Sequence, residues 1–544
     1  MRGKKLVSLV LSALLALGAA MPLALAEDTM DVGATSQAAM MKEIAAMMPD
    51  DIQLPLTDTP VTLTYWWPWE PDVQKMVTTV ADTLTAQVME ELTGVHIEYI
   101  HPPIGQESEA FSVMLASGDL PDMIYFSNNV KYPGGGVTGV DDGVLLRLNE
   151  LVEQYAPNYT FWRNYTPDHR RQTITDDGIM WGIAQINAIA EPANLGMCVR
   201  QDKLDQLGME APRTLDEMHE VLKAAKEKLG MESPLLLPPV GVFGDSNILS
   251  AFGVGKDFYV DEGTTVKFGP MQRGYKEYLE MMNQWYAEGL IDKNFVSREN
   301  FTEAPPNDLL VSEDVMMTTT FWGRTIDCMV KRGLTKNEDF WLQAIQAPVK
   351  EAGQTAQIRK INYPVLEQTA VTSSCKDPEL AVKWLDFQFT YQAMLLNNYG
   401  VEGTTFNFVD GAPVFSDLIM NNPDGLNSTD AMRKYVRRGG TGWIDYTRQW
   451  QTNANPASTQ SYYVWDKDGI DQILPPVSLT TEEANEYQSL YADIQTYVQE
   501  MTVSFILGTT SLDTFDSFVS QLEKMNIGRV LEIQQAAYDR YMAR

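Results

Sequence analysis

The chain has 544 residues, and its 73 acidic against 41 basic residues give a formal net charge of -32. A chain of this length exceeds what one hydrophobic core usually supports, so we expect at least two lobes. An acidic surface repels phosphate backbones and anionic lipid, so nucleic acid is excluded as an expected partner.

The N-terminus has the pattern of a secretory signal peptide over residues 1–26. Arg2, Lys4 and Lys5 precede an apolar run over residues 6–17, and small residues follow at 24–26. The apolar run is too short for a stable membrane span. We therefore expect an exported protein, extracellular or periplasmic, at the outer face of the cytoplasmic membrane. No cysteine lies near the expected cleavage site, so no lipid anchor is expected.

Strands and helices alternate at the start of the folded body. Residues 27–60 are rich in Met and Ala, then punctuated by proline, and indicate an N-terminal tether. Alternation and turn residues then predict strands over 61–66, 96–100 and 123–126, with helices over 71–94 and 107–116 between them. This rhythm is typical of parallel βαβ units.

A capped helix is predicted from Asp377. Asp377 is a suitable N-cap, and Pro378 suits the first helical position. Apolar residues from Leu380 to Phe387 then recur at helical spacing. The helix is followed by Asn398-Tyr-Gly-Val-Glu-Gly, a turn bounded by glycines. Taken alone, this stretch is an ordinary amphipathic helix.

Several separate segments resemble, in the right order, the family 1 extracellular solute-binding proteins of ABC importers, whose larger branch handles carbohydrates. They lie at 116–125, 199–208, 212–218, 289–292, 374–403 and 528–541. The resemblance implies an α/β fold of the two-lobed periplasmic-binding-protein type (type II), with several hinge crossings between the lobes.

The resemblance also implies a division of the chain. The N-terminal lobe would comprise 61–190 and 312–365, and the C-terminal lobe 191–311 and 366–544, with a cleft-lining insertion at about 405–480. Crossings would fall near 188–197, 308–316 and 362–374.

The first candidate ligand site ends the first strand. Trp66, Trp67, Trp69 and Glu70 surround Pro68, which stops the strand. Ligands of open α/β sheets bind outside the carboxyl ends of strands. Sugars present apolar C–H faces that stack on aromatic rings, and their hydroxyls need polar partners. The alternative is that the alternating side chains are buried in the core.

Further candidates are aromatic or polar side chains near strand ends and glycine turns. For each of them core packing or an ordinary turn is the alternative. The set consists of Asn128, Asn129, Trp181, Trp322, Arg324, Tyr399, Glu402 and Trp443, the last expected in an exposed loop.

Catalytic and metal-binding patterns are weak. Residues 134–139 match G-x-G-x-x-G but open no predicted helix, so a flexible loop is expected. The four histidines form no metal motif, and no acidic stretch has the spacing of a calcium loop. We therefore expect no catalytic residues, no metal and no cofactor. Of the three cysteines, Cys198, Cys328 and Cys375, one pair could form a disulfide, or all three could be buried hydrophobes.

The expected function is the capture of a carbohydrate, an oligosaccharide, by hinge closure, and its delivery to the permease subunits of an ABC transporter by a monomeric binding protein. Two alternatives remain open. One is a secreted glycosidase, which needs two carboxylates about 5 to 9 Å apart. The other is a surface glycan-sensing or adhesion protein with the same fold.

Overall fold

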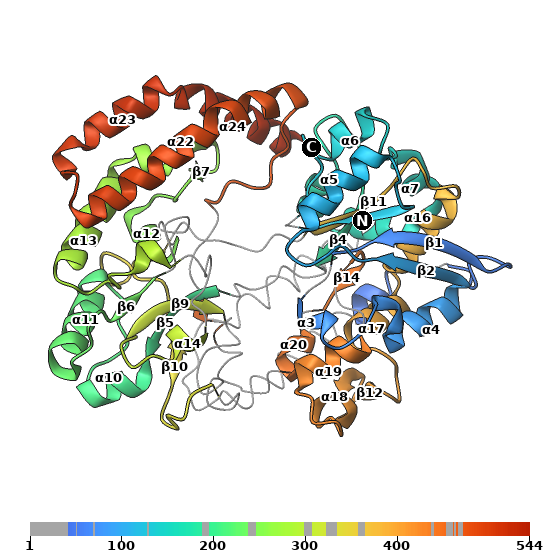
Figure 1. Cartoon of the computed structure of the whole chain (residues 1–544), viewed down its shortest axis with the longest axis horizontal. Coiled ribbons are helices and arrows are strands. Elements are labelled where there is room, and N and C mark those ends of the chain that lie inside the picture. Colours follow the sequence, from blue (N-terminus) through green and yellow to red (C-terminus); the bar gives the residue numbers. More distant parts are fainter. Residues whose placement is uncertain are drawn as a thin grey trace, which may run out of the picture.

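The structure is a computed structural model that describes residues 42–49, 52–68, 71–127, 130–187, 195–237, 246–298, 307–321, 334–356, 365–436, 440–445, 447–452, 461, 464–465 and 472–544. These residues form two lobes, each built around its own sheet and its own hydrophobic core. In Figure 1 the first lobe lies on the right and the second on the left.

A six-stranded mixed sheet in the order β14-β4-β11-β3-β1-β2 forms the first lobe. β1 is parallel to β2 and β3, whereas β11 is antiparallel to both β3 and β4. The carboxyl ends of β1, β3 and β4 therefore lie at one edge, together with the start of β11. The strands are β1 (Val61–Trp66), β2 (Val95–Ile100), β3 (Met123–Phe126), β4 (Ile183–Asn187), β11 (Val365–Val371) and β14 (Trp443–Ile444).

Helices cover both faces of this sheet. Successive side chains of each strand point to opposite faces, so the sheet has a hydrophobic core on each side. Tyr65 and Tyr125 enter the larger core, whereas Trp66 and Phe126 enter a smaller core beside α5. The helices are α3 (Pro71–Gln74), α4 (Leu84–Thr93), α5 (Glu107–Ser117), α6 (Gly136–Asp141), α7 (Asn149–Tyr155), α8 (Pro157–Arg163), α9 (Pro167–Gln172), α16 (Pro378–Phe387), α17 (Tyr391–Asn398), α18 (Asp417–Met420), α19 (Ser428–Tyr435) and α20 (Thr447–Thr452), and a hairpin is formed by β12 (Phe406–Val409) and β13 (Ala412–Phe415).

The second lobe contains a four-stranded sheet in the order β10-β5-β9-β6. Its strands are β5 (Leu195–Arg200), β6 (Leu235–Leu236), β9 (Met317–Phe321) and β10 (Leu342–Ala344), and β7 (Phe258–Asp261) and β8 (Thr265–Phe268) form a separate hairpin. The α-helices are α10 (Gln201–Leu207), α11 (Leu215–Leu229), α12 (Ser246–Leu249), α13 (Arg273–Ala287), α14 (Asn307–Leu310), α22 (Thr481–Leu507), α23 (Phe515–Lys524) and α24 (Ile527–Ala543), and short 3-10 turns are η4 (Ser250–Phe252), η5 (Gly269–Met271), η6 (Phe295–Ser297) and η8 (Leu512–Thr514). Figure 1 shows α22, α23 and α24 along the outer side of this lobe.

The βαβ order at the start of the body agrees with the prediction, but the single helix expected over 71–94 is interrupted. α3, the 3-10 turn η2 (Val80–Asp82) and α4 replace it. Thr79 and Thr83 each accept a hydrogen bond from a backbone N–H two or three residues on, so each begins a new element. Gly94 ends α4 in the left-handed conformation, at the predicted break.

The membership of the lobes differs from the predicted division. β9 and β10, within 312–365, pair with β5 in the second lobe, whereas α16, α17 and β14, within 366–544, pack in the first. The chain therefore crosses between β4 and β5, between β10 and β11, and between α20 and Trp465, which packs on Cys198 in the second lobe. No crossing lies at 308–316, because α14 and β9 belong to the same lobe.

The predicted tether and the predicted insertion both contribute residues to the core of the first lobe. Ile44 and Met48, in the predicted tether, are buried in its core. The predicted insertion at 405–480 includes the β12–β13 hairpin, α18, α19 and α20, and apolar residues of the hairpin, α18 and α19 join the same core.

The described cysteines are single thiols. Cys198 and Cys375 are buried and free, in different lobes, while Cys328 lies outside the described residues. Within the described ranges, none of the helices has both the length and the apolar character that crossing a bilayer requires.

Candidate functional site

An aromatic cluster lies where β1, β2 and β3 end. The ring of Trp67 stacks on Tyr125 with 4.8 Å between centroids, and it meets Tyr65 and Tyr99 edge to face. A Cβ atom at Gly440 would lie 2.1 Å from the Trp67 ring, so only glycine fits there, at a φ of +82°. The backbone of 440–442 thus packs closely over the edge of the sheet.

A carboxylate accompanies this cluster. The hydroxyl of Tyr125 donates to Glu367, on the neighbouring strand β11. Burial, and secondarily the Glu367 charge, raise the pKa of Tyr125, so its hydroxyl keeps its proton at neutral pH. His101 follows β2 at the same edge, and burial lowers the pKa of its imidazole. Its Nδ1 lies 2.9 Å from the carbonyl oxygen of Trp67, which orients the ring.

A pocket of about 220 Å³ lies between the two lobes. The first lobe supplies the end of α9, the segment between α9 and β4, and two residues of β11, whereas the second supplies the segment that leads into α22. The lining residues are Gln172, Thr173, Ile174, Thr175, Ile179, Trp181, Val365, Gln368, Pro476 and Ser478. A ligand in this pocket would therefore contact both lobes.

Trp181 gives this pocket its aromatic wall. Its indole packs on the backbone of Gly136, where an added Cβ would lie 2.0 Å from the ring, and its edge meets Phe126 at 5.6 Å. The ring is only partly buried. One face is thus held by the first lobe, and the remaining surface is available to a ligand in the pocket.

Amide and hydroxyl groups surround the indole. Gln172 donates from Nε2 to the hydroxyl of Tyr541, 3.2 Å away. Its Oε1 is buried and receives no hydrogen bond from any described group. An unpaired acceptor is costly to bury, and this oxygen is closed off from solvent in the present arrangement of the lobes. Gln368 and Ser478 add further polar groups from opposite lobes.

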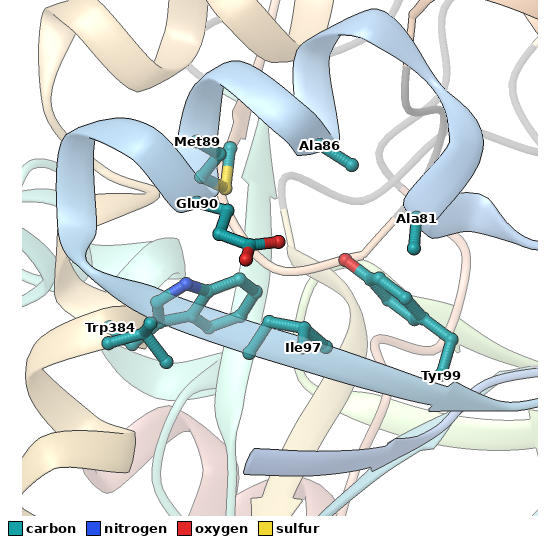
Figure 2. A pocket seen from close by; sticks show the side chains of 8 residues that line it. Ala81, Ala86, Met89, Glu90, Ile97, Tyr99 and Trp384 are labelled. Atoms are coloured by element: carbon teal, nitrogen blue, oxygen red, sulfur yellow. The ribbon is translucent and has the colours of Figure 1, made fainter. Parts of the chain in front are cut away.

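A second, smaller cavity is no candidate for a ligand. It lies between α4 and β2 and has a volume of about 10 Å³, room for about one water molecule. Figure 2 shows the Glu90 carboxylate between the indole of Trp384 and the hydroxyl of Tyr99. A sugar ring does not fit there.

A family model described as bacterial extracellular solute-binding protein matches residues 78–394, more than half of the chain. The chain belongs to this family.

Two curated relatives of this solute-binding protein are named for the glycans they handle. The fructooligosaccharide ABC transporter substrate-binding protein FusA of Streptococcus pneumoniae is 24% identical over 505 residues, covering 85% of this chain and 88% of FusA. The polygalacturonan/rhamnogalacturonan-binding protein YtcQ of Bacillus subtilis is 24% identical over 479 residues, covering 83% of this chain and 87% of YtcQ.

Solved structures share the two-lobed fold of this solute-binding protein. The alginate-binding protein AlgQ2, solved without calcium ion, is 26% identical with a TM-score of 0.68, covering 89% of this chain and 99% of that one. A solute-binding protein from Bifidobacterium longum subsp. infantis, 16% identical, has a TM-score of 0.71 and covers 89% and 98%. Among the residues described in the present chain, no three His, Cys, Asp or Glu side chains gather as a metal site.

The candidates predicted from sequence have different positions in this solute-binding protein. Trp181 lines the interlobe pocket, and Glu402 is exposed on its glycine turn. Trp66 and Trp67 are 3% and 5% exposed, packed on opposite faces of the first sheet. The remaining candidates lie outside the described residues: Trp69, Glu70, Asn128, Asn129, Trp322 and Arg324.

Four candidates are corrected by their burial, since Tyr399 and Trp443 are enclosed as Trp66 and Trp67 are. Tyr399 is 1% exposed, because its hydroxyl donates to Asp445 at 2.6 Å and its ring packs on Phe415. Trp443, expected in an exposed loop, is also 1% exposed. Its indole packs on Trp162 at 4.4 Å and donates to the carbonyl of Thr390.

Sequence reasoning missed several residues of the site. Gln172 ends a helix without any motif, and Gln368 sits within a strand, so neither carries a local signal. Glu367 and Tyr125 become partners only because β11 pairs with β3. For Ser478 the one local signal is the paired proline stretch at 475–476, which indicates an extended segment.

Proposed function

We propose that the chain captures an oligosaccharide between its lobes and delivers it to the permease subunits of an ABC importer. The observation that carries this proposal is the interlobe pocket, which has an aromatic wall at Trp181 and polar side chains from both lobes. The names of FusA and YtcQ support the same ligand class.

The pocket offers both kinds of contact that a sugar needs. Its apolar C–H face can stack on the indole of Trp181, while its hydroxyls reach the amides of Gln172 and Gln368. Ser478, from the other lobe, adds a hydroxyl. A ligand that touches both lobes has differential affinity for the state in which they are close together, so it favours closure.

The proposal includes export through a signal peptide over residues 1–26, function as a monomer and release of the sugar unchanged. The family description supports an extracellular location. The ATP-driven step would belong to the transporter, and the role of this chain would end at binding and docking.

A panel of oligosaccharides tests the proposal by isothermal titration calorimetry and thermal shift. We expect at least one neutral or acidic glycan to bind and raise the melting temperature, with no new reducing ends after long incubation. Release of reducing ends would contradict the binding role, and absence of any binding across the panel would contradict the ligand class.

Trp181→Ala is the sharpest variant for this test. Loss of the stacking surface should weaken binding at least about tenfold, or ~1.4 kcal/mol, as for other buried aromatic contacts. Trp341→Ala is the matched control, since Trp341 is 43% exposed in the second lobe and lines no part of the pocket. Equal affinities of the two variants would remove Trp181 from the site.

A further inference from the structure

The last turn of α24 leaves the second lobe and docks on the first. The body of this helix is anchored in the second lobe, where Ile527 and Val530 join the core and Tyr538 packs on β7 and β8. Its end reaches the loop after α9, and Figure 1 shows the C-terminus beside the first lobe.

Two arginines of this turn hold one carboxylate of the first lobe. Arg540 Nε donates to Asp176 Oδ2 at 2.6 Å, and Arg544 Nε donates to Asp176 Oδ1 at 2.7 Å. Arg544 also donates to the carbonyl oxygens of Arg171 and Ile174, at 2.6 and 2.7 Å. The Arg544 and Asp176 side chains are only 6% and 8% exposed. Charge-assisted hydrogen bonds of this kind, between largely buried groups, have a defined geometry and are little screened by salt.

The same turn holds the segment that leads into α22. Arg540 donates to Glu483 at 2.9 Å through Nη1 and at 2.5 Å through Nη2, and Nη2 also donates to the carbonyl oxygen of Ser478 at 3.3 Å. Glu483 completes the capping box of α22 with Thr480. One guanidinium therefore joins a loop of the first lobe to a helix start of the second.

This contact lies beside the pocket and close to the start of β11, where the chain re-enters the first lobe. Val365, the first residue described after the crossing from β10, lines the pocket together with Thr173, Thr175 and Ser478. The loop held by Arg544, residues 171–176, is therefore a wall of the pocket. A contact close to the hinge moves little when lobes rotate about it, so it can persist through opening and closing.

We propose that the last turn of α24 is a noncovalent pivot between the lobes. Arg540 and Arg544 act as positioning residues: through Asp176 they limit the range of interlobe motion and hold the pocket wall in place. The limit on motion stands independently of any ligand, whereas the effect on affinity rests on the proposed oligosaccharide binding.

Distance measurements between the lobes test the pivot without a ligand. Spin labels on genetically encoded ketone residues at Ser112 on α5 and Lys228 on α11, both exposed, would report the interlobe distance by double electron–electron resonance. The Arg540→Ala/Arg544→Ala double variant should broaden the ligand-free distribution. A distribution that superimposes on that of the unaltered protein would overturn the pivot.

Two further variants make the result specific. Arg529→Ala is the control: Arg529 lies on the same helix but pairs with Glu486 and Glu532 inside the second lobe, so the distribution should stay unchanged. Asp176→Asn keeps the shape of the loop and removes the charge, and it should broaden the distribution even if the double variant fails to fold. Broadening by Arg529→Ala to the same extent would also overturn the pivot.

Affinity for the oligosaccharide found in the panel gives a separate readout. The double variant should bind about tenfold more weakly, with Arg529→Ala unchanged. A broadened distribution with unaltered affinity would overturn the role in positioning the pocket wall. If no glycan in the panel bound, the proposed function would fail, while the distance measurement would still decide the pivot.

Discussion

Asp386 is an ionisable residue enclosed in the first lobe. It lies on α16, is 1% exposed, and accepts hydrogen bonds from Asn158 Nδ2 at 2.9 Å and from the Tyr159 backbone N–H at 2.8 Å. Burial raises the pKa of Asp386 to about 7, although both hydrogen bonds act in the other direction. The carboxyl therefore joins α8 to α16 and changes charge near neutrality.

The raised pKa predicts a pH-dependent stability. Between the unfolded value of about 4 and the folded value of about 7, the native state binds the extra proton. The contribution of Asp386 is therefore complete below about pH 4 and is lost as the pH rises through about 7, by about 1.4 kcal/mol per pH unit within this window. Asp386→Asn should remove this dependence, so the difference in unfolding free energy between variant and unaltered protein should change across the same window.

Chemical denaturation at several pH values between 4.5 and 8 measures this difference. Asp493→Asn, at an exposed position of α22, controls for the loss of one acidic residue and should give a constant difference. A constant difference for Asp386→Asn as well would show that Asp386 does not titrate in this range.

Single residues also show what local sequence can predict. Trp181 is predicted as a ligand candidate, and it lines the interlobe pocket because Gly136 leaves room for its ring. Trp443 has an equally aromatic and glycine-rich setting, yet Trp162, distant in sequence, covers it. The local sequence marks a tryptophan as a candidate for ligand contact. Whether its ring is exposed depends on residues that are distant in sequence and pack against it.

At the scale of elements, α16 shows how local rules determine a helix start. Asp377 Oδ1 accepts a hydrogen bond from the Leu380 N–H at 2.9 Å, and Pro378 occupies the first turn. Asp377→Ala should lower the unfolding free energy by about 1 kcal/mol, because a backbone N–H loses its partner.

Urea denaturation followed by tryptophan fluorescence measures this loss. Lys376→Ala, at the exposed residue just before the cap, is the control and should stay within about 0.5 kcal/mol of the unaltered protein. Equal stability of both variants would mean that the cap contributes nothing measurable.

Elements with a single clear start signal are predicted well. A stretch that contains two possible N-caps is not. β1 and β3 have their predicted bounds, and α16 begins at the predicted cap, Asp377. The stretch 71–94 is broken because Thr79 and Thr83 both serve as caps, a choice that helical periodicity alone does not reveal.

At the scale of the molecule, membership of a lobe depends on which strands pair. The partners of β9, which are β5 and β6, place it in the second lobe, and β11 returns the chain to the first. The sequence of a strand specifies which side chains lie on each of its two faces, but it does not specify which strand pairs with it. The two-lobed architecture follows from length and family resemblance, whereas the division between lobes requires the sheets.

Closure is the last prediction at this scale. Because the pocket is lined by 172–181 of the first lobe and by Pro476 and Ser478 of the second, a bound oligosaccharide should protect both segments from amide hydrogen exchange. Bound at 100 times its Kd, it should stabilise the fold by about 2.7 kcal/mol. Small-angle scattering should show a smaller radius of gyration in the same samples, since bridging favours the closed state.

The Trp181→Ala variant distinguishes closure caused by the bound sugar from nonspecific effects of the glycan. At the glycan concentration that saturates the unaltered protein, the variant should show weaker protection in both segments and less compaction, because the same contact holds the sugar and draws the lobes together. Arg529→Ala should behave as the unaltered protein, as its ion pairs lie within one lobe. Protection confined to 172–181, with an unchanged radius of gyration, would mean that the first lobe binds the sugar alone and that the second lobe does not close on it.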